Sequence, residues 1–96
     1  MSCSLSTHVL DTGTGRPAVG VPVELSRDDH VLATAETDAD GRARLADDLA
    51  PGVYRLVFSP PSPFFTRVEL SIALEDGHYH VPLLVSPYGC ATYRGS

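Results

Sequence analysis

The chain has little cysteine and no long apolar run. Its two cysteines, Cys3 and Cys90, are too few for a disulfide framework, and no CxxC spacing suggests a cysteine-based metal site. We therefore expect two free thiols, as in a reducing cytosol. No stretch approaches the roughly 20 apolar residues that a membrane span requires, so a membrane protein is not expected.

Basic residues are also scarce. Seven Lys and Arg residues stand against twelve Asp and Glu, which gives a formal net charge of −5 at pH 7. Because the basic residues form no cluster, neither nucleic acid nor an anionic membrane is an expected partner. The first six residues lack both the basic and the apolar segment of a secretory signal, and we expect a cytoplasmic location.

The length allows one domain, which we place at residues 1–96. A chain of this size buries roughly 60–68% of the surface that its unfolded form exposes. Assembly with further copies would increase that burial. Neither a linker nor a repeat of solenoid length divides the chain.

The residues that are present follow a β pattern. Short runs rich in Val, Leu, Thr, Tyr and Phe alternate with clusters of Gly, Pro and Asp, and no helical period appears. The pattern predicts eight strands, at residues 5–11, 21–26, 30–37, 42–45, 53–58, 65–74, 78–85 and 90–94. Turns at short, regular intervals favour an all-β, antiparallel eight-stranded β-sandwich.

Three connections and one proline give local predictions. Residues 12–17 and 47–52 are predicted as a loop and a turn, because Gly, Pro and Asp gather there. Residues 59–64 contain three prolines, so we expect no helix between the fifth and sixth strands. Pro82 cannot donate to a neighbouring strand, which predicts an edge or bulged position for it.

Three histidines are candidates for chemistry. Period two places His8 on one face of its strand together with Ser6, and it places His78 and His80 on a common face of theirs. Such histidines can be core residues bonded to a carbonyl, or residues of a partly solvated face. Three of them together could also begin a zinc site.

Arginine and the tail offer further candidates. Arg42 directly follows a tight Asp-Gly turn, and alternation puts Arg42 and Arg44 on the face opposite to Ala43 and Leu45. An arginine there is ordinarily solvated, but toward histidines its planar fork would hold a carbonyl, urea or carboxylate group. A chain end is ordinarily frayed.

Residues 12–58 by themselves indicate only a β-sandwich, since many sandwich modules share such a pattern.

The two ends of the chain resemble one family. Residues 5–18 read LSTHVLDTGTGRPA, which is similar to the opening signature of 5-hydroxyisourate hydrolases. Residues 78–89 read HYHVPLLVSPYG and residues 92–96 read TYRGS, which resemble the closing signature of the same enzymes. The terminal Tyr-Arg-Gly-Ser distinguishes these hydrolases from the hormone-carrying transthyretins, which share their fold.

The resemblance implies a fold, an activity and an assembly. It implies a transthyretin-like sandwich that hydrolyses 5-hydroxyisourate, an intermediate of urate breakdown, to 2-oxo-4-hydroxy-4-carboxy-5-ureidoimidazoline. It implies neither a cofactor nor a metal. It also implies a homotetramer, a dimer of dimers, with active sites where the dimers meet.

The same resemblance implies roles for residues that match the family motifs. The catalytic residues are His8, Arg42 and His80, with His80 as the expected base, His8 in the proton relay and Arg42 on the oxyanion. His8 and Arg42 also bind substrate, together with the tail residues Tyr93, Arg94, Gly95 and Ser96.

The chain departs from the family in two places. The connection at residues 59–64 is shorter than usual and leaves no room for the family's helix. Cys90 and Ala91 stand where the family usually has Tyr and Ser. A non-catalytic transthyretin-like binding module is the alternative function, and a zinc-dependent hydrolase is a third hypothesis.

Overall fold

A computed structural model describes residues 2–95, which form nine strands and no helix. The strands are β1 (Cys3–Asp11), β2 (Arg16–Pro17), β3 (Pro22–Arg27), β4 (His30–Glu36), β5 (Arg42–Leu49), β6 (Gly52–Phe58), β7 (Val68–Leu74), β8 (Gly77–Val85) and β9 (Cys90–Thr92). Within this part of the chain there is consequently no helix that could cross a membrane.

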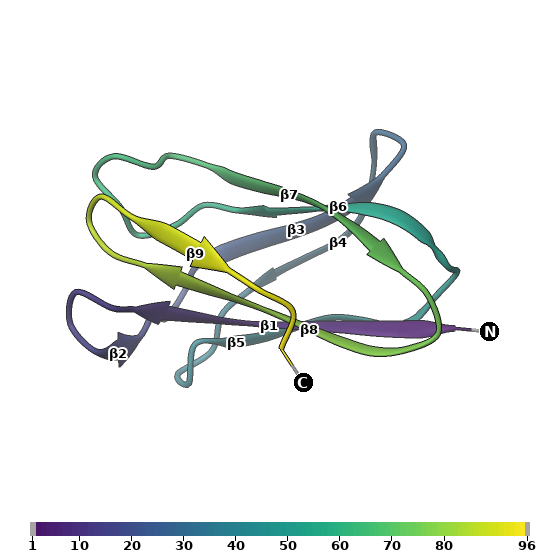
Figure 1. Cartoon of the computed structure of the whole chain (residues 1–96), viewed down its shortest axis with the longest axis horizontal. Helices are drawn as coiled ribbons and strands as arrows, with labels where there is room; N and C mark the ends of the chain where they lie inside the picture. Colours follow the sequence, from purple (N-terminus) through teal and green to yellow (C-terminus); the bar gives the residue numbers. More distant parts are fainter. Residues whose placement is uncertain (1, 96) are drawn as a thin grey trace.

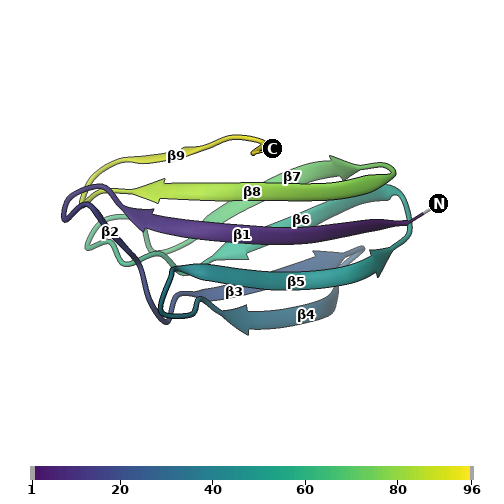
Figure 2. The same cartoon turned by 90° about the horizontal axis from the view of Figure 1, so that it is seen from below.

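The strands form two sheets packed face to face (Figure 1). One sheet has the order β2-β1-β8-β9, with β5 paired to β1 on the same side as β2, and the other has the order β4-β3-β6-β7. Figure 2 shows the first sheet from its outer side, with β9, β8, β1 and β5 side by side. The two-layer β-sandwich predicted from the sequence is confirmed.

The core lies between the sheets because each strand alternates apolar and polar residues. In β1, Cys3, Leu5, Thr7 and Val9 are buried and the residues between them are half-buried on the outer face. The largest fully buried side chain, Phe58, comes from β6 in the opposite sheet. Burial of such side chains takes apolar surface out of water and stabilises the fold by about 25 cal/mol per Å² buried, which is the main stabilising contribution.

Two buried threonines connect the core to the backbone. Thr7 Oγ1 donates to the carbonyl of Val81, which ties β1 to β8 with an O···O distance of 2.6 Å. Thr37 Oγ1 donates to the carbonyl of Ala18 and accepts from the N–H of Val21. Among residues 2–95, no buried side-chain nitrogen or oxygen lacks a partner, so hydrogen bonds offset the cost of removing these groups from water.

The predicted strands all occur, with three corrections. The sandwich is not wholly antiparallel, because β1 and β8 run parallel over nine residue pairs. Residues 16–17 of the predicted loop form the short strand β2 against Leu10 and Asp11. Strand β5 continues to Leu49 through the predicted turn, since pairing with β1 extends as far as Cys3. Pairing between distant segments outweighed the local turn signal in the case of β5, whereas β2 pairs with the end of β1 across a short hairpin.

The prediction for Pro82 is wrong. Pro82 lies in β8, which has β1 on one side and β9 on the other, so it is not on an edge strand. The pairing with β9, however, stops at Leu83 and resumes only as an isolated bridge between His80 and Gly95. A gap in the second ladder next to Pro82 lets the sheet accommodate a residue without an N–H.

The connection between β6 and β7 forms no helix, as predicted. Ser62 organises it, since Ser62 Oγ accepts from the N–H groups of Phe64 and Phe65 and donates to the carbonyl of Pro87. One hydroxyl thereby replaces the hydrogen bonds that a helix would have supplied and ties this loop to the loop after β8.

Two valines, one that points into the core and one that points to solvent, test this arrangement. Val9→Ala removes two fully buried methyl groups and should lower the free energy of unfolding by about 2 kcal/mol. Val53→Ala alters a side chain that is 59% exposed and should cost less than about 1 kcal/mol, from strand propensity alone. Urea unfolding at one protein concentration measures both, and equal losses would contradict the assignment of faces.

Candidate active site

The outer face of the β1-containing sheet brings together the three residues expected to be catalytic. His8 comes from β1, Arg42 from β5 and His80 from β8. Arg42 is the register partner of His8, and the two histidine rings lie 6.4 Å apart between centroids. His8 and Arg42 each stand between two buried residues, and His80 stands between the half-buried Tyr79 and the buried Val81, so the packing of the core directs all three outward.

A shallow cavity of about 290 Å³ lies between these strands. Arg42 and His80 line it, together with Ser6, Asp38 and Arg44. Arg44 pairs with Asp47 and is thereby partly neutralised. Among residues 2–95 no carboxylate lies within salt-bridge distance of Arg42, the other arginine of this cavity. The cavity therefore combines a planar cation with an imidazole, a suitable environment for a carbonyl or an oxyanion.

The turn before β5 fixes the position of Arg42. Gly41 has φ of 75°, and a Cβ there would lie 2.5 Å from the carbonyl oxygen of Val9, so only glycine fits. Asp38 Oδ1 accepts from the N–H groups of Arg42 and Asp40 at 3.0 and 2.9 Å. These backbone hydrogen bonds hold the pKa of Asp38 below its ordinary value, and the bond from Arg42 contributes most. The carboxylate therefore stays charged and keeps the turn in place.

The same turn orients His8. The Nε2 of His8 lies 2.8 Å from the carbonyl oxygen of Asp40. Because a carbonyl only accepts, Nε2 carries the hydrogen and the lone pair of the neutral ring is on Nδ1. One five-residue stretch of chain thus sets both the Arg42 backbone and the His8 tautomer.

His80 is the titratable group whose environment suits a base. Its Nδ1 lies 2.9 Å from Ser6 Oγ, so Nε2 is left without a protein partner among the contacts of residues 2–95. Burial lowers the pKa of His80, and the charges of Arg42, His8 and His78 lower it further. A lowered pKa means that the ring is neutral, and able to accept a proton, over a wider range of pH.

Part of the tail packs directly on His80. The N–H of Gly95 donates to the carbonyl of His80 at 2.6 Å, and a Cβ at position 95 would lie 2.8 Å from His80 Cδ2. The predicted site residue Gly95 is therefore in contact with the predicted base. Any larger residue there would displace the ring.

The other tail residues lie differently. The guanidinium of Arg94 stacks over the ring of Tyr79, 4.4 Å from its centroid. Arg94 and Tyr93 line a second cavity of about 390 Å³ along β7 and β9, and Tyr93 is 56% exposed. Within one chain the structure therefore does not bring Tyr93 or Arg94 to the cavity at His80. Ser96 lies outside the described residues.

Sequence reasoning missed two kinds of contributor. Asp38 and the carbonyl of Asp40 orient the site through the turn, and nothing but the Asp-x-Asp-Gly pattern pointed to them. Ser6 was placed on the face of His8 by alternation, but its bond to His80 depends on the register between distant strands. Among residues 2–95, His8, His78 and His80 form no cluster with metal-ligand geometry.

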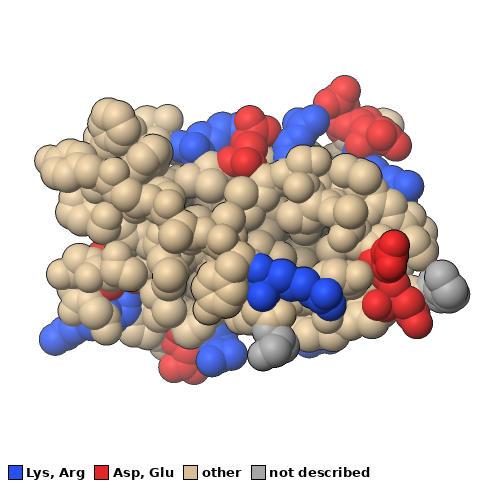
Figure 3. Space-filling model, viewed as in Figure 1, with Lys and Arg blue, Asp and Glu red and all other residues tan. Residues whose placement is uncertain are grey.

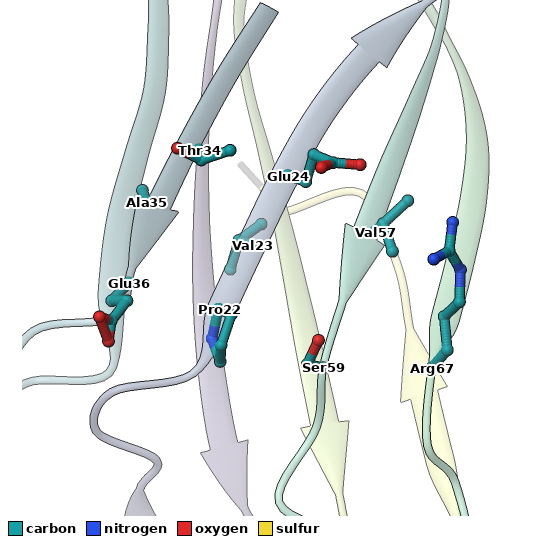
Figure 4. Close-up of a pocket in the computed structure, with 9 residues that line it drawn as sticks. All are labelled: Pro22, Val23, Glu24, Thr34, Ala35, Glu36, Val57, Ser59 and Arg67. Carbon is teal, nitrogen blue, oxygen red and sulfur yellow. The ribbon is translucent and has the colours of Figure 1, made fainter. Parts of the chain in front are cut away.

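Another hollow, of about 610 Å³, lies on the outer side of the opposite sheet (Figure 4). Glu24, Glu36 and Arg67 are its charged residues, and it contains no histidine. On the face shown in Figure 3, acidic and basic side chains are interspersed, mostly along the edges. Neither observation offers an alternative to the grouping of His8, Arg42 and His80.

Comparison with known proteins identifies the family. Residues 5–95 match the family model described as Transthyretin: HIUase/Transthyretin family. This chain belongs to the HIUase/Transthyretin family. The 5-hydroxyisourate hydrolase of Caulobacter vibrioides is 46% identical to it, over 96% of this chain and 97% of the relative.

Solved structures of both kinds of family member resemble the chain. Klebsiella pneumoniae 5-hydroxyisourate hydrolase is 40% identical, with a TM-score of 0.89, and the match covers 98% of this chain and 99% of that chain. Sea bream transthyretin in complex with thyroxine is 29% identical, with a TM-score of 0.86, over 95% and 93%. The two scores are so similar that the fold by itself does not distinguish the two kinds.

The relatives are longer than this chain. The alignment with the Caulobacter vibrioides protein spans 112 positions, whereas this chain has 96 residues. The relative therefore carries residues that this chain lacks. We expect these additional residues of the relative to lie in its connection after β6, which is short in this chain.

The electrostatic description of His80 gives a direct test. NMR titration should place the pKa of His80 below the ordinary histidine value of 6.5. Arg42→Gln removes a neighbouring positive charge and should raise that pKa. The matched variant Arg44→Gln, two residues along the same strand, should leave it unchanged. A His80 that titrates at or above 6.5 in the unaltered protein would contradict the description.

Proposed function

We propose that this protein is a 5-hydroxyisourate hydrolase. Its substrate would be 5-hydroxyisourate, and its product 2-oxo-4-hydroxy-4-carboxy-5-ureidoimidazoline. The observation that carries the proposal is the meeting of His8, Arg42 and His80 on one face, with Gly95 of the terminal motif packed on His80. Relatives named for this activity match nearly the whole chain, which supports the same assignment.

The reaction needs a nucleophilic water, and His80 suits the role of base. With Nδ1 bonded to Ser6, the Nε2 of a neutral His80 is the ring nitrogen left to take a proton from water. The lowered pKa keeps the ring neutral at pH 7. The protonated ring then returns the proton to the nitrogen that leaves when the ring amide opens.

The reaction also needs an electrophilic carbonyl, and Arg42 suits that role. Its guanidinium supplies planar N–H donors beside His80, where negative charge develops on the carbonyl oxygen in the transition state. His8, fixed by the Asp40 carbonyl, offers a second imidazole at 6.4 Å for substrate binding and proton transfer. His8, Arg42 and His80 are the proposed catalytic residues.

A homotetramer would complete the site. The cavity at His80 is open in one chain, and the tail residues Tyr93 and Arg94 lie away from it. We propose a dimer of dimers in which facing sheets enclose the active sites, with Tyr93, Arg94, Gly95 and Ser96 contributing to substrate binding. Residues 1–96 act as one domain in this proposal, and the location is cytoplasmic.

The alternative function is a non-catalytic binding module. The sea bream transthyretin that resembles this chain was solved in complex with thyroxine, so a protein of this fold can bind a small molecule. Binding without turnover is the result that would favour this alternative.

The assembly is testable by mass. Light scattering should give about four times the chain mass of 10.2 kDa, as a closed dimer of dimers requires. A monomer at micromolar concentration would leave the cavity open to solvent and would contradict the proposed site between dimers.

The activity is testable by ultraviolet decay of 5-hydroxyisourate, generated in place by urate oxidation. The unaltered protein should accelerate the decay, and His80→Ala and Arg42→Ala should each reduce kcat/KM by about 100-fold or more, since each removes a group acting in the transition state. His30→Ala, on β4 of the other sheet, is the matched histidine control and should retain full activity.

A chelator in the same assay separates a zinc-dependent hydrolase from the proposed one. Unchanged decay with chelator supports catalysis by histidine and arginine alone. Decay no faster than the spontaneous rate in the unaltered protein would overturn the proposed function and favour the binding module.

A further inference from the structure

A line of hydrogen bonds leads away from His80 along the outer face of β1 and β8. The Nδ1 of His80 lies 2.9 Å from Ser6 Oγ. Ser6 Oγ also lies 3.1 Å from the Nε2 of His78. The other ring nitrogen of His78, Nδ1, lies 2.6 Å from Ser4 Oγ. Four side chains on two neighbouring strands are thereby joined end to end.

The parallel pairing of β1 and β8 creates this line. The register sets Ser4 opposite His78 and Ser6 opposite His80. Because side chains alternate, residues two positions apart share a face, and all four point outward. Both ring nitrogens of His78 are hydrogen-bonded, so His78 bridges Ser4 and Ser6, which are two positions apart on β1. The line runs from the half-buried His80 to the more exposed pair Ser4 and His78.

Two proton arrangements satisfy every bond with Ser6 as a donor within the line, and in a third Ser6 only accepts, from both imidazoles. A neutral imidazole carries one hydrogen, and a hydroxyl donates one. In the first arrangement His80 Nδ1–H donates to Ser6, Ser6 donates to His78 Nε2, and His78 Nδ1–H donates to Ser4. In the second arrangement every bond is reversed, and the hydrogen of His80 is on Nε2.

Arg42 selects the tautomer of His80. Nδ1 of His80 lies against Ser6, Nε2 is the ring nitrogen without a protein partner among residues 2–95, and His80 lines the same cavity as Arg42. A nearby positive guanidinium favours a lone pair over an N–H on that nitrogen. This disfavours the second arrangement, and of the remaining two the first is the one in which the Ser6 hydroxyl also donates to His78; it leaves His80 Nε2 free to accept a proton.

We propose that Ser6 and His78 are positioning residues that hold His80 as its Nδ1–H tautomer, with the Nε2 lone pair turned toward the substrate. Ser6 bonds to His80 directly, and His78 fixes the direction in which the Ser6 hydroxyl donates. Ser4 holds the far nitrogen of His78. Their catalytic significance rests on the proposed hydrolase function, but the tautomer itself does not depend on any substrate.

Nitrogen NMR of the histidine rings tests the tautomer without substrate. In the unaltered protein both His80 and His78 should carry their hydrogen on Nδ1. Ser6→Ala removes the acceptor for His80 Nδ1–H, and His78 should lose its single tautomer as well. Ser6→Thr keeps a hydroxyl on the same face of the strand and should restore both. A His80 that carries its hydrogen on Nε2 in the unaltered protein would overturn the proposal.

Kinetics test whether the tautomer serves catalysis. Ser6→Ala should lower kcat about tenfold, the usual effect of losing one hydrogen bond of about 1.4 kcal/mol, with KM changed less than twofold. His78→Leu should lower kcat by a smaller factor, and Ser6→Thr should restore it. Ser59→Ala after β6 and His30→Leu on β4, both exposed and outside the lining of the His80 cavity, are the matched controls and should leave kcat unchanged.

The outcomes separate the positioning role from the activity. Normal kcat in Ser6→Ala, with hydrolysis by the unaltered protein, would overturn the positioning role alone. An unaltered protein that does not hydrolyse 5-hydroxyisourate, yet holds both histidines as Nδ1–H, would overturn the proposed function and support the hydrogen-bond line.

Discussion

The structure depends on the place of β1 at the junction of three pairings. β1 is paired to β8 in parallel and to β5 and β2 in antiparallel orientation, and its inward residues Leu5, Thr7 and Val9 are fully buried. Because side chains alternate, that burial forces Ser6 and His8 to the outer face. The same constraint acts on β5 and β8, so the core that stabilises the sandwich also assembles the candidate site on its outside.

The electrostatics of the site follow from the closeness of these outward side chains. Two further histidines and an arginine surround His80, and burial together with their positive charges lowers its pKa, so it stays neutral and basic where an exposed histidine would begin to be protonated. Arg42 gains its position from the Asp38 turn. A neutral base next to a fixed cation provides both components that attack on an amide carbonyl requires.

The family uses one sandwich for different purposes. The TM-scores to a 5-hydroxyisourate hydrolase and to a transthyretin, 0.89 and 0.86, are nearly equal. The distinction must therefore lie in the outward side chains, which contribute little to the fold and are free to differ. In this chain the outward residues of β1, β5 and β8 include His8, Arg42 and His80, and the glycine of the terminal motif packs on His80.

The sequence by itself determined the β class, nearly all strand positions, the outward facing of His8, Arg42 and His80 and the family, because these depend on period-two alternation, turn residues and motifs that are local. Only the tertiary structure decided that β8 runs parallel to β1, that Pro82 is central, and that Ser6 contacts both His78 and His80. These features depend on the register between segments about 70 residues apart. Local patterns carry no information on register, which is set when the buried faces pack together.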